Sequence, residues 1–170
     1  LQAITTVTGG TVGRSLKGVS LHDNDPNFGL AGANSAAKMT GVNISGTGVP
    51  ASIGVFVDAL GSTGDTVAMG ILGNTSISNT NTAVSVVGAN ASVNVHDNVA
   101  SIHDNTMAFG INGGSATITH NNLFANGTSL SFSNGATTTA HYNRILSTTT
   151  AIANPNNLTP NLENNWWGCN

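Results

Sequence analysis

Apolar residues recur along the chain in short runs in which every second residue is apolar, and the residues between them are mostly Gly, Ser, Thr or Asn. Alternation with a period of two is typical of β-strands, because successive side chains point to opposite faces. Gly, Asn, Thr and Ser favour turns over helix interiors. The pattern therefore predicts an all-β chain of short strands joined by tight turns.

A longer period is superimposed on this alternation. An apolar anchor residue followed three residues later by Asn recurs, in the pairs Leu21 and Asn24, Ile71 and Asn74, Val95 and Asn98, Ile118 and Asn121, Ala140 and Asn143, and Leu162 and Asn165. Ile44 and Thr47 fill the one gap, so that successive anchors lie 22 to 27 residues apart. A second apolar run follows in most repeats, at residues 28–30, 53–57, 84–86, 109–111, 130–132 and 152. Self-similarity at a fixed period predicts a repeat architecture.

A helix-free repeat of this length predicts a single-stranded parallel β-helix, a solenoid of about seven coils in which equivalent side chains stack. A leucine-rich repeat has a similar period, but its dense leucine consensus is missing from this chain. A β-sandwich would not keep equivalent residues in columns. We expect one domain over residues 1–170, with an N-terminal edge or cap at 1–13, coils at 14–163 and a closing motif at 164–170.

Two segments resemble a known family. Residues 115–127, SATITHNNLFANG, are similar to a repeat of the pectate-lyase-like superfamily, and residues 164–168, NNWWG, resemble a closing motif of bacterial surface β-helix proteins. The resemblance covers nearly the whole chain and implies a right-handed parallel β-helix. It implies no single function, because this superfamily includes lyases, hydrolases, epimerases, tailspikes and adhesive stalks.

The recurring asparagines are the most specific feature of the sequence. We expect Asn24, Asn74, Asn98, Asn121, Asn143 and Asn165 to occupy the same turn in successive coils. Asn tolerates left-handed backbone conformations, and stacked side-chain amides can form a hydrogen-bonded ladder along parallel strands. The column is therefore predicted to be structural, with a sugar-contacting stripe as the alternative.

Histidines lie beside this column. His96, His120, His141 and Glu163 fall on one predicted edge, where imidazole and carboxylate groups could bind zinc. Coils about 4.8 Å apart would place His96 and His141 about 10 Å apart, so at most a weak metal site is expected. Tyr142 and Trp166 are candidates for stacking on a ligand. We expect Trp167 to point inward as a plug over the last coil.

Charge narrows the range of functions. Only 6% of residues are charged, with Lys plus Arg numbering 4 and Asp plus Glu numbering 7, whereas about a quarter is usual in soluble domains. Nucleic-acid binding and membrane insertion are not expected, because the chain has neither a basic stripe nor a long apolar run. The acids form no evident trio facing Arg or Lys, so we predict no catalytic residue and no cofactor. Arg144 and Glu163 are expected to form an ion pair.

Two functions follow from these features. The first is a non-catalytic extracellular or cell-surface module: a rigid stalk, an adhesin segment or a fibre subunit that stacks head to tail. The alternative is a polysaccharide-binding or polysaccharide-degrading β-helix protein. Expected partners are further domains of a longer chain, copies of the chain end to end, or a polysaccharide. The sequence leaves the role of Cys169 open.

Overall fold

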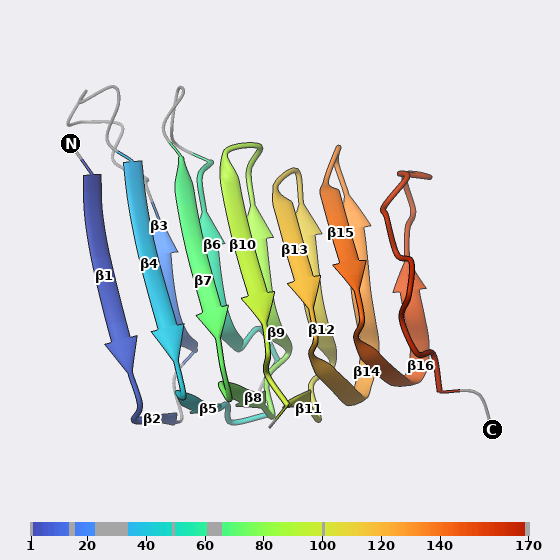
Figure 1. Ribbon diagram of the computed structural model, residues 1–170, viewed down its shortest axis with the longest axis horizontal. Coiled ribbons are helices and arrows are strands. Elements are labelled where there is room, and N and C mark those ends of the chain that lie inside the picture. Colours follow the sequence, from blue (N-terminus) through green and yellow to red (C-terminus); the bar gives the residue numbers. More distant parts are fainter. Residues whose placement is uncertain are drawn as a thin grey trace.

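The computed structural model describes residues 2–13, 16–22, 34–48, 50–60, 66–99 and 101–168. These residues form strands and turns, and all the strand pairings between them are parallel. The fold is a parallel β-helix, as the sequence predicts, and Figure 1 shows its strands stacked side by side along the long axis.

Each coil passes through three faces. The front face in Figure 1 is a six-stranded sheet, made of β1 (Gln2–Thr8), β4 (Asn34–Thr40), β7 (Val67–Leu72), β10 (Ala91–His96), β13 (Ser115–Thr119) and β15 (Thr137–His141). The short face begins with β2 (Thr11–Gly13), β5 (Asn43–Ser45), β8 (Ser76–Ser78) and β11 (Ile102–His103). The back face begins with β3 (Lys17–His22), β6 (Ile53–Asp58), β9 (Thr82–Val87) and β12 (Met107–Asn112).

Two long strands join the last two faces in the C-terminal coils. β14 (Asn122–Ser133) pairs with β11 through its first residues and with β12 through its last ones. β16 (Arg144–Ala153) follows β14 in parallel, with register shifts near Asn126. The short and back faces therefore form one continuous sheet of ten strands.

The core consists of apolar columns to which all three faces contribute. The front face contributes the buried side chains of Met39, Ile71, Val95, Ile118 and Ala140. The short face contributes those of Ile44, Ile77, Ile102, Leu123 and Ile145. The back face contributes those of Val57, Val86, Ile111 and Phe132. Burial of these columns is the main driving force for folding.

The structure corrects the register of the first two repeats. Leu21 lies on the back face opposite Val57, and Ile44 lies on the short face opposite Ile77. Neither belongs to the front-face column of Ile71, which continues toward the N-terminus through Met39. All three faces bury Leu, Ile or Val, so an apolar residue alone does not identify its face.

The second apolar runs are confirmed from the second repeat onward. Residues 53–57, 84–86, 109–111, 130–132 and 152 lie in β6, β9, β12, β14 and β16. Residues 28–30 lie outside the described part of the chain. Residues 2–13 hold β1 and β2, which pair with β4 and β5, so they are edge strands of the two sheets.

Candidate functional site

The corner between the front and short faces uses the same local device in the C-terminal coils. A residue with positive φ makes the bend, and a buried or half-buried Asn follows it. The bending residues are Asp97 (φ 60), His120 (φ 55), Tyr142 (φ 56) and Asn164 (φ 57). The following Asn residues are Asn98, Asn121, Asn143 and Asn165.

Hydrogen bonds join these asparagines along the axis of the solenoid. The Asn98 side-chain amide donates to Asn121 Oδ1 at 2.9 Å, Asn121 donates to Asn143 at 3.1 Å, and Asn143 donates to Asn165 at 2.9 Å. The same oxygens accept the backbone N–H of the preceding Asn in the ladder. Each amide also donates to a backbone carbonyl of the preceding coil. This corner ladder satisfies polar groups that would be costly to bury unpaired.

The corner ladder continues through Thr75 rather than Asn74. Asn74 is exposed at φ 61, and the Thr75 backbone N–H donates to Asn98 Oδ1 at 3.0 Å. Gly73 and Asn74 both lie in the bend where the next coil has Asp97 alone, and this extra residue moves Asn74 out of the column. The predicted member Asn24 lies outside the described residues, and its anchor Leu21 belongs to another face.

A second ladder stands at the next corner, between the short and back faces. The Asn105 side chain donates to Asn126 Oδ1 at 3.0 Å, and Asn105 Oδ1 accepts the Thr80 hydroxyl at 2.7 Å. The bends before them are at Asn79, Asp104 and Ala125, all with positive φ. The sequence prediction did not include this ladder. The signal was the repeated triplet His-Asp-Asn at 96–98 and 103–105, which marks one corner each.

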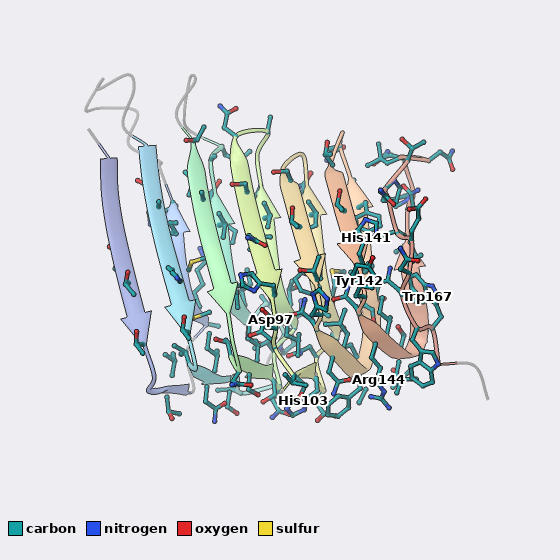
Figure 2. All side chains as sticks on the ribbon, viewed as in Figure 1. Asp97, His103, His141, Tyr142, Arg144 and Trp167 are labelled. Atoms are coloured by element: carbon teal, nitrogen blue, oxygen red, sulfur yellow. The ribbon has the colours of Figure 1, made fainter. Side chains whose placement is uncertain are left out.

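Around both corners, several outward side chains of the C-terminal coils are large, and most of these are aromatic or imidazole rings. This set, called the ring surface here, consists of His96, His103, His120, Phe124, His141, Tyr142, Arg144 and Trp166. Figure 2 shows Tyr142 and Arg144 in the C-terminal coils and His103 at the lower edge of the view, below the middle coils. The N-terminal coils have small polar residues in the same two columns of the short face. Ser45 and Ser78 precede His103 and Phe124 in one column, and Asn43 and Ser76 lie in the column that reaches Arg144.

The rings stack along the axis. His103 and Phe124 have centroids 4.9 Å apart and planes 3° from parallel, and His120 and Tyr142 have centroids 5.2 Å apart. The Arg144 guanidinium lies 5.2 Å from the centroid of the Trp166 ring. The distances match the spacing of parallel strands, about 4.8 Å, because each pair joins neighbouring coils.

The predicted metal ligands do not converge. His96 and His141 end β10 and β15, with Thr119 between them in register, so their backbones are two strands apart. His120 lies in the bend, where its ring stacks on Tyr142. Among the described residues, which include Glu163, no group of three or more His, Cys, Asp or Glu side chains could hold a metal ion. His96, His120, His141 and Glu163 therefore form no single cluster in the structure, and a weak metal site at these residues stays a prediction.

Carboxylates near the ring surface pair locally. His96 Nδ1 lies 2.7 Å from Asp97 Oδ2, and His103 Nδ1 lies 2.6 Å from Asp104 Oδ2. The expected Arg144–Glu163 ion pair is not formed, because Arg144 Nη1 donates to Asn122 Oδ1 at 2.9 Å and the guanidinium covers Trp166.

The two predicted stacking residues are both exposed. The exposed fraction is 59% for Tyr142 and 50% for Trp166. Tyr142 lies in the bend and Trp166 pairs with Arg144 on the short face, so they occupy different columns of neighbouring coils. Trp167 packs against the core, as predicted, and follows the column of Ile145. Cys169 lies outside the described residues.

A shallow groove of about 330 Å³ lies on the front face, away from the ring surface. It is lined by small side chains of β4, β7, β10 and β13, among them Ala36, Ala68, Gly70, Ser92 and Ser115. Hydroxyl, amide and methyl groups line it. The ring surface, which holds imidazole, phenol, indole and guanidinium groups, is the better candidate for a site.

None of the described residues forms a helix with the length and hydropathy needed to cross a membrane. The chain matches no protein-family model, no curated protein and no solved structure. The resemblance to the pectate-lyase-like superfamily and to the surface-protein closing motif stays a prediction.

Proposed function

We propose that this chain is a non-catalytic structural module of the cell exterior, serving as a rigid stalk, an adhesin segment or a fibre subunit. The observation that carries the proposal is the continuity of bonding along the axis. Parallel backbone pairing runs from β1 to β15 on the front face, and the corner ladder joins four successive coils through side chains. Such a solenoid resists bending because each coil is hydrogen-bonded to the next.

The composition supports the same role. Charged residues make up 6% of the chain, and the outward residues of the front face are mostly Ser, Thr, Asn, Ala or Gly. The backbone ladders and the buried asparagines supply stability with few surface ion pairs, which contribute little in any case. A hydroxyl-rich surface with few charges and a small net negative charge suits a module that is exposed to solvent outside the cell.

The proposed partners are further domains of a longer chain or copies of the chain end to end. β1, β2 and β3 form the N-terminal edges of the two sheets, and strand edges present backbone groups that pair readily with another chain. A coaxial contact of this kind does not close into a ring and would extend as a fibre.

Two measurements test the module. Electron microscopy and sedimentation of the isolated chain should show either rods of one chain or coaxial chains of rods. Incubation with acidic and neutral polysaccharides should release no unsaturated products and no reducing ends. Product release that requires the folded chain would replace the stalk with the alternative, a polysaccharide-degrading enzyme.

A further inference from the structure

We propose that the ring surface binds an uncharged saccharide chain, with sugar rings stacking on Tyr142 and Trp166. This inference goes beyond the structural role, which needs only the core and the ladders. It concerns the short face and the corner before it, and it does not involve the groove on the front face.

The first argument is that folding does not require large side chains at these positions. Asn43, Ser45, Ser76 and Ser78 occupy the short-face columns in the N-terminal coils, which have the same backbone pairing. In the C-terminal coils, His103 and Phe124 occupy one of these columns, and Arg144 and Trp166 occupy the other. The backbone pairing of the short face therefore does not depend on the aromatic side chains.

The second argument comes from the backbone of Tyr142. Its φ is 56°, in the left-handed region, where the equivalent bends elsewhere use Gly41, Asn74, Asp97, Asn164 or, in the adjacent coil, His120. A bulky side chain costs about 1 kcal/mol or more in this region, whereas Gly, Asn and Asp cost less. The side chain is 59% exposed, so core packing does not account for the cost. Strain at an exposed residue points to a role outside the fold.

The third argument is that the rings are held in place before a ligand arrives. His120 stacks on Tyr142 with an interplanar angle of 16°, and Arg144 is fixed over Trp166 by its bond to Asn122. An aromatic platform that is already ordered loses little conformational entropy on binding. The C–H face of a pyranose ring stacks on such a platform. Its hydroxyl groups can hydrogen-bond to the side-chain amide of Asn122, which also holds Arg144.

The fourth argument concerns charge and selects the class of saccharide. Arg144 is the cation of this surface, and the other three Lys and Arg residues of the chain precede residue 40. The carboxylates of Asp97, Asp104 and Glu163 lie at the same corners. An acidic polysaccharide or a nucleic acid would meet more negative than positive charge here, and nucleic-acid binding depends on many cations. A neutral chain of hexoses, pentoses or N-acetylhexosamines avoids this repulsion.

The test uses the full chain and hexasaccharides of glucose, xylose, mannose and N-acetylglucosamine, with hexagalacturonate as the charged counterpart. Calorimetry and tryptophan fluorescence at millimolar sugar measure the dissociation constant. Tyr142→Asn and Trp166→Thr are the site variants, because Asn is the residue that the fold itself uses in this bend. Phe56→Ala, which removes an aromatic ring from the back face beside Lys17, is the matched control.

We expect at least one neutral hexasaccharide to bind. Each site variant should weaken that binding about tenfold or more, and Phe56→Ala should leave it unchanged. Thermal unfolding of Tyr142→Asn should occur at or above the wild-type temperature, which separates loss of binding from loss of fold. Binding of none of the neutral sugars, equal binding by wild type and Tyr142→Asn, or preference for hexagalacturonate would each overturn the inference. None of these results would affect the stalk, which is tested by shape and by the absence of product release.

Discussion

After β4 the chain turns its corner through Gly41, and after β15 it turns the equivalent corner through Tyr142. Val42 is buried behind the first bend, and Asn143 is buried behind the second. The Val42 backbone N–H has a hydroxyl acceptor, Thr75 Oγ1, at the long distance of 3.5 Å. The Asn121 backbone N–H, in the equivalent position three coils later, has Asn143 Oδ1 at 2.9 Å.

The two corners make the same left-handed bend in two ways, one with glycine and one with a residue that has a side chain. Glycine makes a left-handed bend without steric cost, but it loses conformational entropy on folding and offers no side chain. A buried Asn bonds the coils on both sides of it, and this stabilisation offsets the cost of a side chain in the bend. The C-terminal corners can therefore carry Asp97, His120 and Tyr142, whereas the N-terminal corners remain glycine.

Breaking the corner ladder at its centre should have the largest effect. Asn121→Ala removes three donor bonds and leaves the Asn98 backbone N–H without its acceptor. It also removes one of the three acceptors of the Asn98 side-chain amide, which keeps the carbonyls of Ile71 and His96. Because unpaired buried polar groups cost about 1–3 kcal/mol each, the free energy of unfolding should fall by about 3 kcal/mol or more. Urea unfolding followed by circular dichroism measures the change.

The control is an Asn whose bonds are exposed. Asn134 bonds to Asn112 and Asn156 at the surface, and Asn134→Gly keeps its positive φ while removing its side-chain bond. This variant should lose less than about 1 kcal/mol, because water can replace an exposed partner. Equal losses in the two variants would show that burial of the ladder is not what stabilises the C-terminal corners.

The C-terminal half also contains a polar group that weakens it. The Thr138 hydroxyl is buried in the column of Val93 and Ala116, and it has no hydrogen-bond partner among the described residues. Thr138→Val keeps the shape and removes the unpaired group, so stability should rise by about 1 kcal/mol. Thr137→Val, on the exposed side of the same strand, serves as the control in the same urea titration. A loss of stability in Thr138→Val would mean that this hydroxyl has a partner in solution.

The sequence was sufficient to predict the solenoid, its strand columns in the C-terminal coils and the structural role of the corner asparagines there. The two-residue alternation follows from burial of one side of each strand, and the repeat of one coil follows from the stacking of equivalent residues. Both periods are therefore visible in the sequence. It was not sufficient for Leu21 and Ile44, since all three faces bury the same residue types. It also misplaced Asn74, because an extra residue in a bend changes the register without changing the composition.

For the ring surface too, some features could be predicted from the sequence and others could not. The outward direction of Trp166 was recognisable from the strand alternation, whereas the exposure of Tyr142 comes from the bend in which it lies. The stacking of His120 on Tyr142 and of Arg144 on Trp166 was not recognisable, because it depends on side-chain rotation between neighbouring coils. The predicted metal ligands do not form a cluster for a related reason. Residues at equivalent positions of successive repeats stay a full strand spacing apart unless their side chains turn toward one point.

Extending the corner ladder toward the N-terminus should make the two halves more alike. Thr75 is buried, has nearly the volume of Asn and already donates its backbone N–H to Asn98 Oδ1. In Thr75→Asn, the new amide can donate to Asn98 Oδ1, as Asn98 donates to Asn121. We expect a gain of about 0.5 kcal/mol in the free energy of unfolding, the net value of one such bond. A loss of more than about 1 kcal/mol would show that the extra residue at Asn74 displaces this position from the ladder.

The smallest expected effect is on one backbone amide, and it tests the comparison at the position where the halves differ. In native-state hydrogen exchange, the Val42 amide should exchange about tenfold faster than the Asn121 amide, because its 3.5 Å bond is a weaker restraint on local opening. In Thr75→Asn the new side-chain oxygen replaces the hydroxyl as the acceptor for Val42, so exchange at Val42 should slow while exchange at Asn121 stays unchanged. Slower exchange at both amides would indicate a global gain in stability, and unchanged exchange at Val42 would mean that its protection comes from burial and not from the acceptor behind it.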